Sequence, residues 1–318
     1  MGRAFTLGKH AKRKETKEKR RTEISSGGIR VTLKSVLTIA GSDTIGGAGI
    51  QADIKTLLAN GVYAMSAVTA LTAQNTLGVT AIEETSPHFL AAEIDAVFDD
   101  ICPDAIKIGM AGSAPLIRTI ADRLRAHRGK NVVLDPVMVA TSGARLLQED
   151  AIAALTAALF PLAVVITPNL PELELLSGGA VQSVEDRVAA ARQLSTTWHC
   201  AVLAKGGHAA DSADDLLVTE EDVITFPGVR IHTPNTHGTG CTLSSAIAAN
   251  LAKGFPLAIA IDRAKAYVTG ALSAGLDVGH GCGPLHHGFD LESAFCPMYE
   301  DGIFSEKRRA NESHGTAP

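Results

Sequence analysis

The sequence predicts an α/β protein whose mostly parallel sheet is covered by helices on both faces. Short apolar runs of strand length alternate with stretches of helical period from Ser35 onward, and this alternation is typical of such a sheet. Aromatic residues make up only 4% of the chain while small residues are abundant, which suits helices packed closely on parallel strands. With 318 residues, 46% of them hydrophobic, the chain is long enough to bury the core of one large domain.

The expected elements follow one another in a regular order. Apolar runs predict strands at 35–41, 64–75, 104–110, 131–138, 163–169 and 200–208, and the second of these runs into a polar loop. Helical period predicts helices at 49–61, 87–101, 114–127, roughly 241–253 and 256–275. Two short β runs around an acidic turn predict a hairpin over 215–226.

Two terminal segments lie outside this pattern. Residues 1–34 hold eleven Lys or Arg against three Glu, a charge of +8 within a chain of net charge −5. Such a basic segment with few apolar residues is expected to be disordered. We favour a solvated extension over a tether to nucleic acid or to a membrane surface. Periodicity is also lost over 291–318, so we expect one folded domain over 35–290 followed by a loosely ordered tail.

The composition argues against several classes of protein. The sequence contains no run of roughly 20 apolar residues, which a membrane-spanning helix needs, and its basic N-terminus is not followed by the apolar stretch of a secretory signal. The five cysteines are an odd number without CxxC spacing, which argues against a disulfide framework and a metal cluster. A reducing cytoplasm is therefore the expected location.

Polar residues gather where the predicted strands end. These clusters are GSD (41–43), AQN (73–75), KIGM (107–110), DPVM (135–138), TPNLPE (167–172) and KGGH (205–208). In open α/β sheets, ligands bind outside the carboxyl ends of the strands. The arrangement therefore indicates an enzyme.

A glycine-rich turn, GSDTIGGAGIQA at 41–52, follows the first strand and opens a helix. Residues 47–52 fit G-x-G-x-x-A, a degenerate form of the dinucleotide fingerprint, but the acidic residue expected about twenty positions later is missing. Two interpretations remain open, a turn that only allows close packing and a turn that closes over a small substrate. In the second, Asp53 projects from the first helical turn.

A second glycine turn, HGTGC at 237–241, is expected to bind phosphate. The sequence contains no G-x-x-x-x-G-K-[ST] motif, but unpaired amides at a helix N-terminus bind anions without one. Gly238 and Gly240 allow the turn and a close approach, and Thr239 adds a hydroxyl donor. Cys241 is expected to be the first residue of the helix, where its pKa is lowered and a thiolate can act as a general base. The alternative is a small buried apolar residue.

Two carboxylates follow other strands and are candidates for holding Mg²⁺ on a nucleotide. Asp135 precedes a proline, and Glu172 lies three residues after Asn169. Mg²⁺ in nucleotide sites is usually held by one or two carboxylates. The alternatives are a turn or cap for Asp135 and an ordinary helix start for NLPE, since Asn and Pro both favour one.

Taken together, these residues resemble the hydroxymethylpyrimidine/phosphomethylpyrimidine kinase family of the ribokinase-like superfamily. The matching stretches run in the family's order from Val36 to Phe289: TIAGSDTIGGAGIQADIKT, TALTAQNTLGV, KIGM, NVVLDPVM, TPNLPE, KGGH, NTHGTGCTLS and VGHGCGPLHH. The resemblance implies a three-layer α/β/α fold with a small lid. It also implies a cytoplasmic, homodimeric enzyme that uses ATP and Mg²⁺ to phosphorylate 4-amino-5-hydroxymethyl-2-methylpyrimidine and then its monophosphate, for thiamin biosynthesis.

The same resemblance assigns roles to individual residues. Gly238, Thr239 and Gly240 form the anion hole and Cys241 is the base. The pyrimidine is contacted by Gly41, Asp53, Gln74 and Met110, the ATP phosphates lie near Asn169, Lys205 and Thr239, and Mg²⁺ lies near Asp135 and Glu172. A flexible lid falls at 138–147.

The chain departs from the family's pattern at Thr72, where an apolar residue is expected, and this can alter the pyrimidine pocket. Two alternatives remain. A pyridoxal kinase of the same subfamily is disfavoured because Gln74 is present, and a non-catalytic pyrimidine-binding module is disfavoured because it has no need for Asp135, Glu172, Lys205 and Cys241 together.

Overall fold

Eight strands form one twisted sheet in the computed structural model, which describes residues 32–138, 148–207 and 213–292. Their order across the sheet is β10-β9-β8-β7-β6-β5-β1-β2. The strands are β1 (Ser35–Ala40), β2 (Tyr63–Val68), β5 (Ala105–Ile108), β6 (Val132–Leu134), β7 (Ala163–Ile166), β8 (Ala201–Ala204), β9 (Asp215–Val218) and β10 (Val223–Phe226). The six strands β2, β1, β5, β6, β7 and β8 pair in parallel with their neighbours, whereas β9 is antiparallel to β8 and β10 is antiparallel to β9. The mostly parallel sheet and the hairpin predicted over 215–226 are both confirmed.

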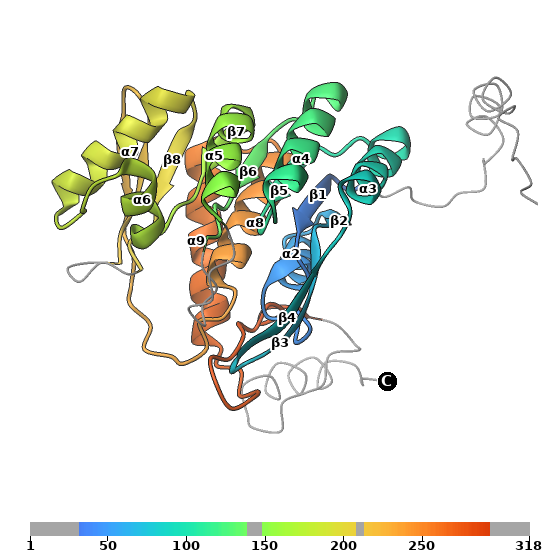
Figure 1. The fold of residues 1–318 in the computed structure, drawn as a ribbon. Helices are drawn as coiled ribbons and strands as arrows, with labels where there is room; N and C mark the ends of the chain where they lie inside the picture. The colour runs from blue at the N-terminus through green and yellow to red at the C-terminus, as the bar shows by residue number, and fades with distance from the viewer. Residues whose placement is uncertain (1–31, 139–147, 208–212, 293–318) are drawn as a thin grey trace, which may run out of the picture. The chain divides into compact units, whose positions relative to one another are not determined.

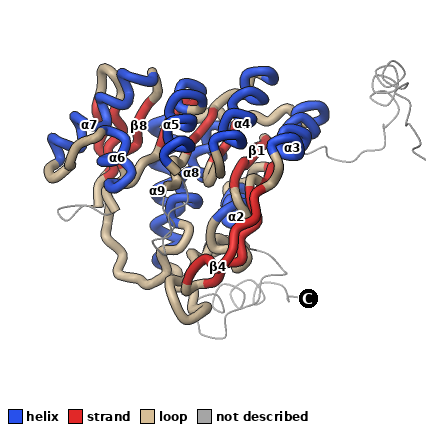
Figure 2. Tube along the Cα trace, viewed as in Figure 1, coloured by secondary structure: helices blue, strands red, loops and turns tan. Residues whose placement is uncertain are grey.

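Helices cover both faces of this sheet (Figures 1 and 2). The helices are α2 (Gly49–Ala59), α3 (Pro87–Asp100), α4 (Ala114–His127), α5 (Glu149–Ala158), α6 (Leu170–Ser177), α7 (Val184–Trp198), α8 (Thr239–Ala252) and α9 (Leu257–Ser273), with a short 3-10 helix η1 at Phe160–Leu162. Successive strand side chains point to opposite faces, so Leu37 packs in a core with α3 to α7, whereas Val36 packs with α2, α8 and α9. The result is the three-layer α/β/α fold that the resemblance implies.

Helix α8 is buried along most of its length. Its residues from Thr242 to Ala252 are all buried, between the sheet and the helices α2 and α9. A helix enclosed on all sides needs small side chains so that its neighbours can approach. The run of Ala and Ser in this segment therefore serves packing. The helix begins at Thr239 rather than at Cys241, and Gly238 is its N-cap at φ +81°.

The segment predicted as one strand at 64–75 is divided at Thr69. The Thr69 amide donates to the Ala40 carbonyl at 3.0 Å, and its hydroxyl donates to the Met110 carbonyl at 2.7 Å. The first of these bonds is a last link between β2 and β1. Beyond it the chain continues as β3 (Ala70–Asn75), which pairs with β4 (Gly78–Glu84) in a separate two-stranded sheet. This correction matters because the small sheet reaches over the carboxyl ends of the strands (Figure 1).

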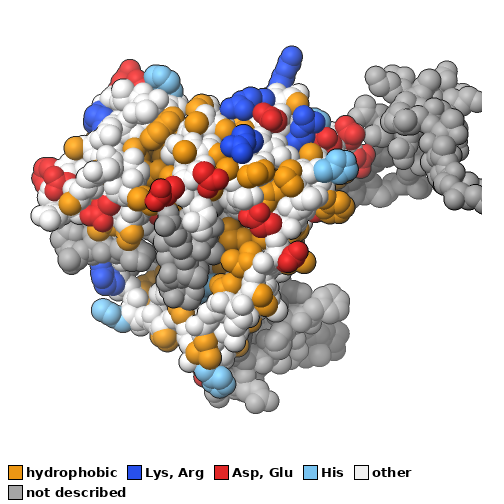
Figure 3. Space-filling model, viewed as in Figure 1, with side chains coloured by type: hydrophobic (Ala, Val, Ile, Leu, Met, Phe, Trp, Pro, Cys, Tyr) orange, Lys and Arg blue, Asp and Glu red, His pale blue; other side chains and the backbone are white. Residues whose placement is uncertain are grey.

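Several predictions lie outside the described residues. The basic extension up to residue 31, the predicted lid apart from Met138, and the tail beyond residue 292 are among them. No described helix is long and apolar enough to cross a membrane. On the face drawn in Figure 3, acidic and basic side chains are interspersed with single apolar ones, as on an ordinary solvated surface.

Candidate active site

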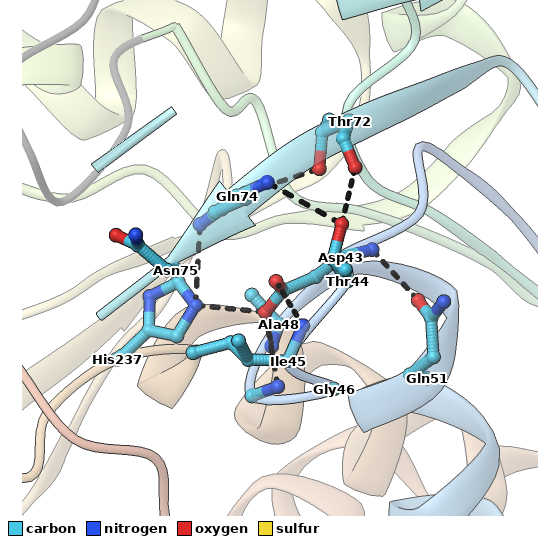
Figure 4. Close-up of polar contacts among 12 residues, drawn as sticks. Asp43, Thr44, Ile45, Gly46, Ala48, Gln51, Thr72, Gln74, Asn75 and His237 are labelled. Atoms are coloured by element: carbon cyan, nitrogen blue, oxygen red, sulfur yellow. Dashed lines mark hydrogen bonds and ion pairs between the residues drawn. The ribbon is translucent and has the colours of Figure 1, made fainter. Parts of the chain in front are cut away.

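The first glycine turn is organised around one carboxylate, Asp43. Its oxygens accept hydrogen bonds from the amides of Ile45, Gly47 and Ala48 at 3.2, 2.9 and 2.7 Å (Figure 4). The His237 imidazole lies 2.8 Å from the same carboxylate. Burial alone would raise the pKa of Asp43, but the bonds from His237 and the backbone amides outweigh burial and lower it. Asp43 is therefore a buried anion that shapes this turn.

His237 joins the two glycine turns. It is separated from Asp43 by 194 positions and precedes the N-cap Gly238. A Cβ at Gly238 would lie 1.8 Å from the Gly47 carbonyl oxygen, so only glycine allows the two turns to touch. The turn at the N-terminus of α8 is thereby held against the turn at the N-terminus of α2.

Three of the four residues predicted to bind the pyrimidine lie around these turns. A Cβ at Gly41 would lie 2.3 Å from the Met110 Cε atom, so the two residues are in contact. Gln74, on β3, has its carboxamide 3.3 Å from the His237 ring. A cavity of about 270 Å³ opens beside it, lined by Gln74, Asn75, Thr76, Leu77, Gly78, His237, Gly281 and Cys282.

Asp53 is placed differently from the prediction. Its side chain is fully enclosed, and its two carboxylate oxygens each lie 2.9 Å from the Lys107 ammonium. The hydroxyls of Thr38 and Ser245 donate to the same carboxylate at 2.6 and 2.7 Å. Burial alone would lower the pKa of Lys107, but the neighbouring Asp53 raises it, so the lysine stays charged. This burial corrects the expectation that Asp53 contacts the substrate.

Cys241 lies in the first turn of α8, close to this buried pair. Its thiol accepts a hydrogen bond from the Gly49 amide, and the side chain is half-buried. Burial raises the pKa of Cys241 to about 11, and the nearby carboxylates of Asp53 and Asp135 add to that rise, although Lys107 opposes it. The expectation of a thiolate near neutral pH is therefore wrong for the protein without ligands, because burial outweighs the helix N-terminus.

A second charged cluster adjoins the same helix terminus. The Lys205 ammonium lies 2.9 Å from Asp135 Oδ1 and 4.0 Å from Glu172 Oε2. The Thr167 hydroxyl also donates to Asp135 Oδ1, at 3.0 Å. A Cβ at Gly240 would lie 3.0 Å from Asp135 Oδ2 and 3.4 Å from the Lys205 ammonium. The predicted anion hole and the predicted nucleotide residues therefore meet at Gly240.

Asn169 and Glu172 form the capping box of α6. The Glu172 amide donates to Asn169 Oδ1 at 2.9 Å, and Glu172 Oε2 accepts from the Asn169 amide at 2.8 Å. NLPE is therefore an ordinary helix start, as the alternative interpretation of this motif proposed. Glu172 nevertheless also lies next to Lys205 in the charged cluster. Burial raises the pKa of Glu172 to about 7, with Lys205 opposing the rise and Asp135 adding to it.

Comparison with known proteins decides the family. The family model described as "Phosphomethylpyrimidine kinase" matches residues 43–286, well over half of the chain. The chain belongs to the phosphomethylpyrimidine kinase family. A hydroxymethylpyrimidine/phosphomethylpyrimidine kinase of Rhizobium meliloti is 53% identical over 255 residues, which cover 79% of this chain and 96% of that one.

Solved structures of phosphomethylpyrimidine kinase and of pyridoxal kinase resemble this family member. The phosphomethylpyrimidine kinase from Clostridium difficile superposes with a TM-score of 0.68 at 42% identity, covering 74% of this chain and 98% of that one. A pyridoxal kinase from Staphylococcus aureus in complex with AMP-PCP and pyridoxal gives 0.73 at 34% identity, covering 81% and 94%. The identity is higher to the phosphomethylpyrimidine kinase.

The sequence analysis of this phosphomethylpyrimidine kinase family member missed residues that the fold brings into the site. His237 and Asp43 lie within motifs that assign them no role, and Lys107 lies in the cluster KIGM without a role of its own. For Lys107 a signal existed, because a lysine inside an apolar strand requires a buried partner. For the His237–Asp43 contact the sequence offered none, since the two residues lie in different motifs.

Proposed function

We propose that this chain is an ATP-dependent kinase of thiamin biosynthesis. It transfers a phosphoryl group to the hydroxymethyl group of 4-amino-5-hydroxymethyl-2-methylpyrimidine and then a second one to the monophosphate. One juxtaposition carries the proposal. The N-terminus of α8 has the cavity beside Gln74 and His237 on one side and the Asp135–Lys205 pair on the other. An acceptor on the first side and a nucleotide on the second would meet at the amides of residues 238–241.

The residues at this helix terminus suit phosphoryl transfer. That reaction depends on positioning and on stabilising charge at the transferred phosphoryl oxygens. Backbone amides at a helix N-terminus provide preorganised donors, and the Thr239 hydroxyl and the Lys205 ammonium add to them. Asn169 lies at the start of α6, where it would face the nucleotide phosphates together with Lys205.

The charged cluster suits Mg²⁺. Asp135 and Glu172 are both buried and share the single Lys205 ammonium. Burial is the main cause of the raised pKa of Glu172, and Lys205 offsets it only in part. A second cation beside this carboxylate would favour its ionised form. Among the described residues no group of three or more ligating side chains could hold a metal alone, so the remaining ligands would be water and phosphate oxygens. Mg²⁺ bound there would supply neutralisation of phosphate charge.

An assay with three acceptors tests the function. Purified protein should form ADP with hydroxymethylpyrimidine and with its monophosphate, and mass spectrometry should detect the diphosphate. Pyridoxal is the comparison substrate because of the structural likeness to the Staphylococcus aureus pyridoxal kinase. A kcat/KM for pyridoxal above that for hydroxymethylpyrimidine would favour the alternative function. ADP formation with none of the three would contradict the proposal.

Replacement of Cys241 by alanine is expected to reduce the first phosphorylation more than the second. The hydroxymethyl group must lose a proton as it attacks, whereas the phosphate acceptor of the second step is already ionised. General-base catalysis is worth about 10²–10⁴-fold, so the first step should lose at least about 100-fold and the second far less. Rates of each step on the purified variant measure this, with replacement of the exposed Cys102 by alanine as the matched cysteine control. Equal losses in both steps would contradict the role of base.

The same role predicts a pH dependence with a defined sign. With a pKa of about 11 for Cys241, only about one thiol in 10⁴ is ionised at pH 7. The rate of the first step should therefore rise about ten-fold per pH unit between pH 7 and 9, until it levels off at the pKa of the thiol in the substrate complex. The second step and the Cys241→Ala variant should stay flat. A flat profile for the first step would contradict proton removal by this thiol.

The homodimer and the cytoplasmic location remain predictions. Sedimentation velocity measures the first, and fractionation of expressing cells measures the second.

A further inference from the structure

Thr72 and Gln74 lie side by side on one face of β3. They are two positions apart in the strand, so both side chains point toward the glycine turn at 41–49 (Figure 4). The Thr72 amide donates to the Ser42 hydroxyl at 3.2 Å, and the Thr72 hydroxyl donates to the Ser42 carbonyl at 2.9 Å. Thr72 is therefore held firmly between the small sheet and the turn.

The Thr72 hydroxyl constrains the neighbouring carboxamide. A hydroxyl has one proton, and the Ser42 carbonyl already accepts it. The carboxamide oxygen of Gln74 is placed 3.3 Å from the same hydroxyl oxygen. With its proton engaged, the Thr72 oxygen can only accept there. It therefore requires an N–H from Gln74.

His237 imposes the complementary constraint. Its Nε2 atom lies 2.8 Å from the Asp43 carboxylate, which only accepts, so Nε2 carries a proton. The Gln74 amide nitrogen is placed 3.3 Å from that same Nε2. Two N–H groups would then face each other. His237 therefore requires the Gln74 oxygen.

Both neighbours are satisfied when the carboxamide is reversed. The oxygen and the NH₂ group of a glutamine occupy nearly the same volume, so the hydrogen-bond partners choose between the two orientations. The reversed Gln74 donates to Thr72 and turns its oxygen toward the Nε2–H of His237. That proton is donated mainly to Asp43 at 2.8 Å, so the contact with Gln74 at 3.3 Å is the weaker branch of a three-centre bond. One oxygen lone pair and one N–H then remain for a ligand, and Gln74 lines the cavity described above.

We propose that Thr72 is a positioning residue that, with His237, holds the Gln74 carboxamide in this single orientation. Gln74 then presents an acceptor and a donor side by side in a defined order. A 4-aminopyrimidine offers the complementary edge, a ring nitrogen that accepts beside an amine that donates. This inference rests on the proposed function and adds a specificity determinant to it, because the order of the two groups selects how the ring lies in the cavity.

The test is equilibrium binding of two ligands, measured by calorimetry. One is hydroxymethylpyrimidine, and the other is 5-hydroxymethyl-2-methylpyridine, which lacks both the 4-amino group and the ring nitrogen beside it. Thr72→Val removes the hydroxyl and keeps the shape of the side chain, and Thr72→Ser keeps the hydroxyl. Thr80→Val is the matched control, because Thr80 lies on the same hairpin and its hydroxyl, among the residues that the structure describes, bonds only to the Ala73 carbonyl.

Thr72→Val should weaken binding of hydroxymethylpyrimidine about five-fold, the size of one neutral hydrogen bond. Binding of the pyridine, which offers Gln74 neither group, should be unchanged, so the ratio of the two Kd values should move toward one. Thr72→Ser should restore the ratio, and Thr80→Val should leave it as in the wild type. If the variant merely loosened the hairpin, binding of both ligands would weaken equally and the ratio of the Kd values would stay unchanged. That result would overturn the proposal.

The wild type separates this inference from the proposed function. If the wild type phosphorylates hydroxymethylpyrimidine and Thr72→Val leaves the Kd ratio unchanged, only the positioning role is wrong. If the wild type binds the ligand but forms no ADP with it, the proposed reaction is wrong, and a changed ratio would still support the role of Thr72. A wild type that does not bind hydroxymethylpyrimidine would overturn both.

Discussion

Replacement of Lys107 by methionine is expected to lower the free energy of unfolding by about 3–5 kcal/mol, because it leaves the Asp53 carboxylate buried without its counter-charge. Lys107 and Asp53 are both fully enclosed, and the ammonium is bonded to both carboxylate oxygens. Only the hydroxyls of Thr38 and Ser245 would remain as donors to that carboxylate. Denaturation of the purified variant by urea measures the change.

Two further variants make this result interpretable. Lys34→Met removes an ion pair with Asp104 whose side chains are 54% and 32% exposed, and it should cost less than about 1 kcal/mol. The double variant Lys107→Met/Asp53→Leu removes both charges and should recover much of the lost stability. A Lys107→Met protein as stable as the Lys34→Met protein would show that the buried pair is not required.

Replacement of Lys205 by alanine is expected to lower kcat about 10²–10³-fold, the usual effect of removing one preorganised donor to a developing charge. Lys205 is the cation next to both Asp135 and Glu172, and it adjoins Gly240 at the N-terminus of α8. Without it, the two carboxylates would repel the nucleotide phosphates, so the KM for ATP should rise as well. Steady-state kinetics with hydroxymethylpyrimidine and ATP measure both parameters.

Lys253→Ala is the matched control for this variant. Lys253 lies at the opposite end of α8, where its ammonium donates to the Asn60 carbonyl at 3.0 Å. Its removal should change kcat by less than about two-fold, as expected for a surface substitution remote from the site. A Lys205→Ala enzyme with kcat within ten-fold of the wild type would contradict the assigned role.

Most of the fold was predictable because it depends on local patterns. Apolar runs marked the strands of the main sheet in their correct order, and a parallel sheet follows from their alternation with helices. Helical periods marked five of the eight described α-helices. Helices α5 and α7 were not predicted, and α6 was considered only as the alternative of a helix start at NLPE. The small sheet of β3 and β4 was not predicted. β3 pairs with β4 rather than with a strand of the main sheet, and no local pattern reveals which strands pair.

The candidate site, like the fold, could be predicted from the sequence only in part. The glycine turn before α8 was recognisable because its anion-binding property arises from consecutive residues. The ionisation of Cys241 was predicted wrongly, because a helix N-terminus is a local feature whereas burial beside Asp53 and Asp135 is not.

The sequence by itself therefore determined the order of the elements, the two glycine turns and the family resemblance, all of which depend on residues close together in the chain. Only the tertiary structure decided which polar groups pair. Thr38 and Lys107 are register neighbours in β1 and β5, and α2 places Asp53 over both. His237 meets Asp43 across 194 positions. The physical reason is that charge pairing and desolvation depend on distances in space, which strand order and register set.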